Sequence, residues 1–183
     1  WAKLNPTMDV QFFDNAACAV FLQEHYDERV FGQYARISNG PIKADYFRLH
    51  YLYAMGGYYA DVDMTPLVPI SDYIPDPGRE RTLHIPSSRL RNQVNPAFIV
   101  ASKHHPTLGT AVQMYATLGK YTYWGWSIVH AGAVLKYIGC EMDTSLQEQC
   151  TLSGMLIAHS SNCYIVRITA SGEAKRVIKG KDE

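Results

Sequence analysis

The spacing of apolar positions predicts a strand and a helix at the start of the chain. Apolar side chains alternate with others over residues 8–13, which is typical of a short strand whose one face carries Met8, Val10 and Phe12. A helix is expected over 16–26, capped by Asp14 or Asn15, because a short side-chain oxygen can accept an otherwise unpaired backbone N–H group.

The same reasoning predicts two further helices. The first covers 28–37 and would bury Val30, Phe31 and Tyr34. The turn at 38–41 opens the second, whose helical spacing is marked by Ile42, Tyr46, Leu49 and Tyr53. Gly56 and Gly57 end this helix, since glycine tolerates the left-handed backbone of a helix terminus and the second glycine lets the backbone pass close to its neighbour.

The stretch GGYYADVDMT, residues 56–65, predicts a strand that carries two carboxylates. Alternation places Tyr59, Asp61 and Asp63 on one face and Tyr58, Ala60 and Val62 on the other. The two carboxylates would lie about 7 Å apart along a strand. Their repulsion is relieved by a divalent ion, or by a diphosphate with its metal, and hard oxygen ligands favour Mg²⁺ or Mn²⁺ over zinc. Two solvated aspartates in a turn are the alternative.

Asp45 and Arg48 are three positions apart and therefore share a face of the preceding helix. They form either a surface ion pair of about 0.5 kcal/mol or less, or a pair that binds sugar hydroxyls and phosphate. Their position relative to Asp61 decides between the two.

Composition excludes some classes of protein. The chain has 183 residues, about one domain, and 17 Lys+Arg balance 17 Asp+Glu, so no net charge attracts nucleic acid. No stretch approaches the ~20 apolar residues of a membrane span, so a membrane would be reached only through a segment not present here. The 13 tyrosines and 3 tryptophans suit either a ligand surface or an aromatic core.

The stretch ADYFRLHYLYAMGGYYADVDMTPL, residues 44–67, resembles the glycosyltransferases whose sugar-binding region contains a DxD motif. This group includes yeast-type initiating mannosyltransferases, lactosylceramide galactosyltransferases and, more remotely, the clostridial glucosylating toxins. The matching positions are Asp45, Arg48, Leu52, Gly56, Gly57, Tyr59, Asp61, Asp63 and Pro66. Weaker similarity extends upstream to the W-x-x-x-N-P opening at 1–6 and downstream to the strand and His-Pro turn at 95–108.

The resemblance implies an α/β protein of the GT-A fold, with a central, mostly parallel sheet flanked by helices. Residues 1–183 would form a single catalytic domain whose first strand lies before Trp1 and is absent from this chain. The implied activity is the metal-dependent transfer of a hexose, with retention, from a UDP- or GDP-sugar to a glycan, glycolipid or glycoprotein acceptor. The implied cofactor is Mn²⁺, or Mg²⁺, and the implied location is the Golgi or secretory-pathway lumen, with the cytoplasm as the alternative.

The resemblance also implies roles for individual residues. Asp63 would ligate the metal, Asp61 would contact it through water or bind ribose and sugar hydroxyls, and Asp45 and Arg48 would hold the donor sugar, with Gly57 and Tyr59 beside them. His159 is the candidate for a further metal ligand, and a structural or surface histidine is the alternative. Asn95 is placed to reach the donor or to form a turn, and Trp126 to stack on an acceptor sugar or to pack in the core.

Two other functions stay open. The letters DVDMT also satisfy D-x-D-x-T, the nucleophile motif of haloacid-dehalogenase-type phosphatases, in which Asp61 would attack phosphate and Asp63 would act as acid and base. The stretch GGYYA is not the aliphatic strand that precedes this motif, and neither Asp-Asp nor Gly-Asp-x-x-x-Asp follows later in the sequence. A non-catalytic sugar-binding homologue would bind a sugar without turnover.

Overall fold

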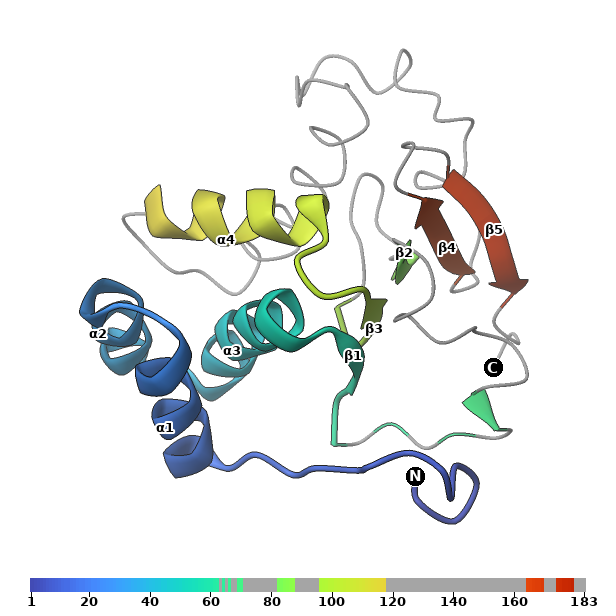
Figure 1. The fold of residues 1–183 in the computed structure, drawn as a ribbon, viewed down its shortest axis with the longest axis horizontal. Coiled ribbons are helices and arrows are strands. Elements are labelled where there is room, and N and C mark those ends of the chain that lie inside the picture. Colours follow the sequence, from blue (N-terminus) through green and yellow to red (C-terminus); the bar gives the residue numbers. More distant parts are fainter. Residues whose placement is uncertain are drawn as a thin grey trace.

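The structure is a computed structural model. It describes residues 1–62, 64, 66, 69–70, 82–87, 96–117, 164–169 and 174–179. Within these ranges it is a mixed α/β structure, with the helices gathered on one side and the strands on the other (Figure 1).

Three capped helices form the first layer, as the sequence predicts. Helix α1 covers Asn15–His25, α2 covers Glu28–Arg36 and α3 covers Gly40–Met55. Each begins after a residue whose side-chain oxygen accepts a backbone N–H of the first turn, namely Asp14, Asp27 and Asn39, at 2.8, 3.0 and 3.1 Å. A fourth helix, α4, covers Pro106–Thr117 and packs against α3.

The described strands form one sheet in the order β1-β3-β2-β4-β5. Their bounds are Gly57–Ala60 for β1, Thr82–Ser87 for β2, Phe98–Ala101 for β3, Tyr164–Thr169 for β4 and Ala174–Lys179 for β5. The register of the first pair joins Gly57 to Ala101 and Ala60 to Phe98.

Every pairing among these strands is antiparallel, so the predicted mostly parallel sheet is wrong for the described part of the chain. Strand β3 lies between β1 and β2 and runs opposite to both. Side chains alternate in the same way in parallel and antiparallel strands, so the residue pattern predicts a strand without predicting its direction.

The strand predicted over 8–13 is also wrong, because residues 9–13 belong to neither a helix nor a strand. The chain there runs from the N-terminal turn to α1 without a strand partner (Figure 1). Phe12, placed on one strand face with Met8 and Val10, is 80% exposed, whereas Phe13 packs between Phe47 and Tyr51 with ring centroids 5.1 Å from each. The Phe13 side chain therefore fixes this segment to α3, where the prediction expected backbone hydrogen bonds to another strand.

The sheet separates two apolar clusters. On the helical side, Ile99 and Ala101 of β3 join the main core with buried residues of all four helices. On the other side, Phe98 and Val100 are buried against Trp1, Tyr58, Ala60 and Ile70. The N-terminal turn and the chain after β1 thus cover the face of the sheet that the helices leave open.

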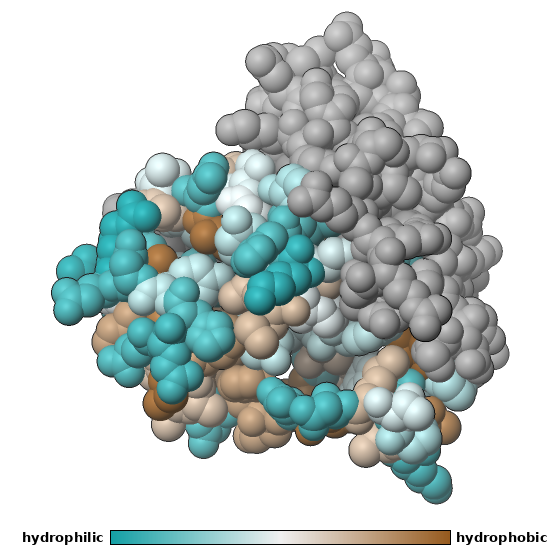
Figure 2. All heavy atoms as spheres, in the orientation of Figure 1, coloured by the Kyte–Doolittle hydropathy of each residue, from teal (hydrophilic) through white to brown (hydrophobic). Residues whose placement is uncertain are grey.

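The visible described surface mixes hydrophilic and hydrophobic residues, with brown residues towards its lower edge (Figure 2). The exposed large apolar side chains in the described ranges are Val10, Phe12, Val20, Met55, Val62 and Met64. None of the described helices has both the length and the apolar character needed to cross a lipid bilayer.

Candidate functional site

Arg48 is the centre of a polar cluster at the junction of α3 and the sheet. Its Nη2 atom lies 2.6 Å from Oδ1 of Asp45 and 3.2 Å from Oδ1 of Asp61, and its Nη1 donates to the carbonyl oxygen of Pro96. The residue is 3% exposed. One guanidinium therefore joins α3 to the residue that follows β1 and to the chain that enters β3.

Tyr59 completes the cluster from β1. Its hydroxyl donates to Oδ1 of Asp61 at 2.7 Å, and the Arg48 guanidinium lies over its ring, 4.6 Å from the centroid. The predicted common face of Tyr59 and Asp61 is therefore confirmed. The aromatic ring shields one side of the cation, and the hydroxyl fixes one oxygen of the carboxylate.

The charges of the cluster do not balance, since two carboxylates share one guanidinium. Burial raises the pKa of Asp45 to about 6, and the negative charge of Asp61 adds to this effect while Arg48 opposes it. Asp45 is almost enclosed, whereas the side chain of Asp61 is 32% exposed. Asp61 is therefore the more exposed of the two carboxylates in the cluster.

The Arg48 Nε atom is buried and has no hydrogen-bond partner in the described part of the chain. A buried donor that lacks a partner costs roughly 1–3 kcal/mol. The two carboxylates of the cluster contact Nη2 of Arg48 and leave the Nε donor unpaired among the described residues. This donor is suited to an oxygen atom of a ligand.

The Gly-Gly turn brings α3 and β1 together. Gly56 has a φ of 72°, and a Cβ atom at this position would lie 2.6 Å from the backbone nitrogen of Lys103. Gly57 has a φ of 101°, but a Cβ there would meet no atom within 4 Å. The close backbone approach expected at Gly57 is therefore made by Gly56, because the chain that leaves β3 passes beside the end of α3.

The strand geometry ends before the second aspartate. The Asp61 N–H donates to the Ala97 carbonyl at 2.8 Å, which prolongs the pairing of β1 with β3, and the Asp61 carbonyl accepts from the Met64 N–H at 3.0 Å in a turn. Val62, expected to share a face with Tyr58 and Ala60, is 90% exposed. A turn therefore begins at Asp61, where the alternation of side chains predicted that the strand would continue.

The structure brings together four of the predicted site residues: Asp45, Arg48, Tyr59 and Asp61. Gly57 lies next to them at the start of β1. Four others, Asp63, Asn95, Trp126 and His159, lie outside the described residues. Within the described ranges, no group of three His, Cys, Asp or Glu side chains could hold a metal ion.

Three contacts of this region are absent from the predicted site. The Pro96 carbonyl binds Arg48, and the residues of the N-terminal turn, Trp1 and Asn5, hold the chain after β1 at Met64 and Ile70. A backbone acceptor leaves no signal in the sequence. Trp1 and Asn5 do leave one, the W-x-x-x-N-P spacing, although the spacing does not say what they contact.

Comparison with known proteins identifies the region that contains this cluster. Residues 1–80 match the family described as "Glycosyltransferase sugar-binding region containing DXD motif". In residues 1–80, the chain is therefore similar to the glycosyltransferases whose sugar-binding region contains a DXD motif.

A curated relative gives a more particular likeness. Over 52 residues the chain is 40% identical to the initiation-specific alpha-1,6-mannosyltransferase of Schizosaccharomyces pombe (strain 972 / ATCC 24843). The aligned part is 28% of this chain and 13% of the relative. No solved structure matches the chain significantly.

Proposed function

We propose that this protein transfers a hexose from a nucleotide-diphosphate sugar to a glycan, lipid or protein acceptor, in a metal-dependent reaction that retains the anomeric configuration. The observation that carries the proposal is the buried Arg48, which holds the exposed carboxylate of Asp61 beside Asp45 in a region matched by the sugar-binding family. A GT-A arrangement of the whole domain over residues 1–183 is part of the same proposal and rests on the family.

In this proposal Asp61 faces the donor, while Asp45 and Arg48 hold it in place. The short contacts from Tyr59 and Arg48 occupy Oδ1 of Asp61, and the exposed part of the carboxylate is suited to a metal-bound water or a sugar hydroxyl. The unpartnered Arg48 Nε adds a donor for a sugar or phosphate oxygen. Asn95 and Trp126 are proposed to contact donor and acceptor.

The proposed cofactor is Mn²⁺, with Mg²⁺ as the alternative. Carboxylate oxygens are the ligands that these hard cations prefer, and Asp61 presents such a carboxylate at the surface of the cluster. Asp61, Asp63 and His159 would hold the ion. When bound, it would act as a Lewis acid that stabilises the charge on the departing diphosphate.

The sugar is proposed from the relative, and the location from the family resemblance. Its printed name is that of a mannosyltransferase, so mannose is the first hexose to test, among both UDP- and GDP-linked donors. A Golgi or secretory-pathway location is proposed from the family resemblance, with the cytoplasm as the alternative.

The proposal is tested by sugar transfer. The protein is incubated with Mn²⁺, a panel of radiolabelled UDP- and GDP-hexoses, and oligosaccharide and glycolipid acceptors. We expect transfer from one donor, and a loss of at least about 100-fold in the Asp61→Asn and Asp63→Asn variants, the upper range for disturbed metal sites. Asp9→Asn is the matched control, because Asp9 is an exposed aspartate whose side chain binds only Gln11 among the described contacts.

The same samples distinguish the other two functions. Release of phosphate from p-nitrophenyl phosphate that disappears in Asp61→Asn, without sugar transfer, would overturn the proposal in favour of a phosphatase. Donor binding without transfer to any acceptor and without hydrolysis would identify a non-catalytic homologue.

A further inference from the structure

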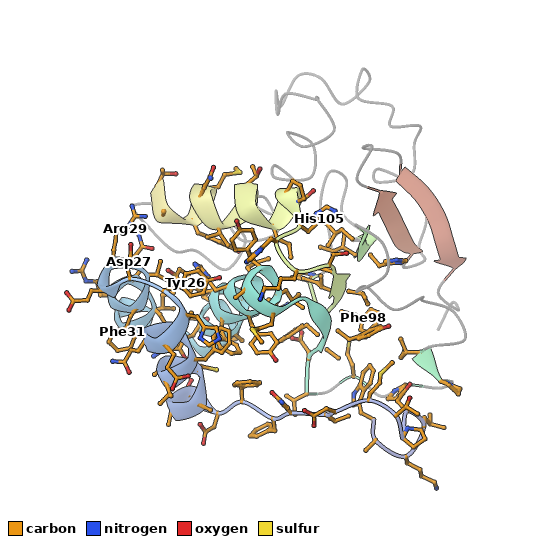
Figure 3. All side chains as sticks on the ribbon, in the orientation of Figure 1. Tyr26, Asp27, Arg29, Phe31, Phe98 and His105 are labelled. Atoms are coloured by element: carbon orange, nitrogen blue, oxygen red, sulfur yellow. The ribbon has the colours of Figure 1, made fainter. Side chains whose placement is uncertain are left out.

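The chain between β1 and residue 70 is held by side chains far away in the sequence. The Trp1 indole Nε1–H donates to the Met64 carbonyl at 2.9 Å. Its ring stacks on Phe98 of β3, with centroids 6.1 Å apart and an interplanar angle of 13°. Phe98 lies on the side of β3 that faces the N-terminal segment (Figure 3).

Asn5 provides a second anchor. Its Oδ1 accepts the Ile70 N–H at 2.8 Å, and its Nδ2 donates to the Trp1 carbonyl at 3.2 Å. The residue is 3% exposed, so both ends of its amide are satisfied inside the protein. The Trp1 carbonyl also accepts the backbone N–H groups of Leu4 and Asn5, which closes the N-terminal turn that carries both anchors.

The segment after β1 is therefore fixed at three points. Asp61 is paired with Ala97 at the end of the sheet, Met64 is held by Trp1, and Ile70 is held by Asn5. Ile70 also packs in the apolar cluster on this face of the sheet, together with Phe98 and Trp1. These anchors lie on both sides of the second aspartate of the D-x-D motif in the sequence.

We propose that Trp1 and Asn5 are positioning residues that hold the backbone at Met64 and Ile70, next to the Asp61 site, in the arrangement that binds the metal and the nucleotide sugar. Neither residue contacts a reacting atom in this proposal, and both act through the backbone of Met64 and Ile70. The proposal rests on the proposed function of the Asp61 site. Its physical basis is preorganisation, since a segment that must be ordered on binding loses affinity to the cost of ordering.

The test combines hydrogen exchange with binding. Asn5→Ala leaves the Ile70 N–H without its acceptor, and Trp1→Phe keeps a ring on Phe98 but removes the donor to Met64. Each variant is compared with wild type by amide hydrogen exchange and by titration with Mn²⁺ alone and with Mn²⁺ plus GDP-mannose, or plus whichever nucleotide sugar wild type binds. Tyr26→Phe is the control, because it removes a hydrogen bond of 2.6 Å to the His50 carbonyl within the helical layer.

We expect faster exchange in 61–70 with unchanged exchange in α1–α3, and donor affinity at least about 10-fold weaker for Asn5→Ala, with a smaller loss for Trp1→Phe. Tyr26→Phe is expected to bind as wild type does. Unchanged exchange in 61–70 would show that the anchors do not exist, and faster exchange with unchanged affinity would show that they position nothing. If wild type binds no nucleotide sugar, the proposed function fails and the positioning role with it, while exchange still decides whether the anchors exist.

Discussion

At the scale of single residues, Arg48 connects the members of the candidate site, since it contacts Asp45, Asp61 and Tyr59. It is buried, it pairs with one carboxylate on α3 and with another just after β1, and its Nη1 donates to a backbone carbonyl. Removing one partner of a buried ion pair leaves an uncompensated charge, which costs more than removing the pair as a whole. The residue therefore stabilises the fold through the same contacts that shape the site.

Replacing Arg48 tests this dual role. We expect Arg48→Met to lower the free energy of unfolding by roughly 3–5 kcal/mol, because Asp45 and Asp61 then repel each other without a cation. The double variant Asp45→Asn/Arg48→Met is expected to recover a substantial part of the loss. Urea denaturation at pH 7.5 measures both, and a cost below about 1 kcal/mol for the single variant would contradict the central place given to Arg48.

His50 gives the protein a dependence on pH. Burial lowers its pKa to about 4 from the ordinary histidine value of 6.5, and its Nδ1 lies 2.8 Å from the Tyr46 carbonyl. The unfolded chain therefore takes up a proton before the native state as the pH falls. We expect the free energy of unfolding to lose up to about 3 kcal/mol through His50 between pH 6.5 and pH 4.

The effect is isolated by comparing wild type with His50→Phe across this pH range. Asp45, whose raised pKa acts in the opposite direction, is present in both proteins and cancels in the difference. The variant is expected to lose less stability than wild type as the pH falls. If the free energy of unfolding changes with pH in the same way in both proteins, the pKa of His50 does not differ between the folded and unfolded states.

The sequence predicts individual contacts only where they are local. The spacing of Asp45 and Arg48 on one helical face is local, and so is the common strand face of Tyr59 and Asp61. The contact between Arg48 and Asp61 depends on how closely α3 packs on the sheet. The residue pattern of α3 or β1 alone does not predict that distance.

At the scale of elements, the unit that forms the site is α3, the Gly-Gly turn and β1. The Gly56 N–H donates to the Leu52 carbonyl at 2.8 Å and ends the helix, and the His104 N–H donates to the Tyr53 carbonyl at the same distance. The chain that leaves β3 is thereby hydrogen-bonded to the last turn of α3. The turn places Arg48 and Asp61, which lie on different elements, within 3.2 Å of each other.

Two glycine substitutions test the steric role of this turn. Gly56→Ala is expected to destabilise the protein by more than about 2 kcal/mol, since its φ is positive and its Cβ would collide with backbone. Gly32→Ala, within α2, is expected to stabilise it by about 0.5–1 kcal/mol, because no atom lies within 4 Å of the added Cβ. Thermal unfolding measures both, and equal effects would contradict the structure of the turn.

The elements themselves were predictable to different degrees. Helix limits follow from side-chain caps that the sequence displays, such as Asp14 and the turn before α3. Strands depend on partners elsewhere in the chain, so the alternation at 8–13 predicted a strand that the described structure does not contain. Strand direction depends on connections, and the alternation of side chains leaves it undetermined.

At the scale of the whole molecule, one segment connects fold and function. Residues 1–80, which match the glycosyltransferase family, contain Trp1, Asn5 and the side chains of the Arg48 cluster. Strand β3 lies next to both groups, since Trp1 stacks on Phe98 and Arg48 donates to the Pro96 carbonyl just before β3. The matched region therefore includes the N-terminal turn, whose Trp1 packs against Phe98 and Val100 on the sheet face opposite the helices. Asp61 belongs to the Arg48 cluster through its side chain and is fixed to Ala97 through its backbone N–H.

The most direct test of this account is calorimetric titration of the protein with a panel of UDP- and GDP-hexoses, with Mn²⁺ and with EDTA. We predict that one nucleotide sugar binds in the presence of Mn²⁺. Its affinity should fall at least about 10-fold with EDTA and in Asp61→Asn, and should be unchanged in Asp9→Asn. Absence of binding by every donor with Mn²⁺, or equal affinity of Asp61→Asn and wild type, would contradict the proposal that Asp61 serves a metal-dependent nucleotide-sugar site.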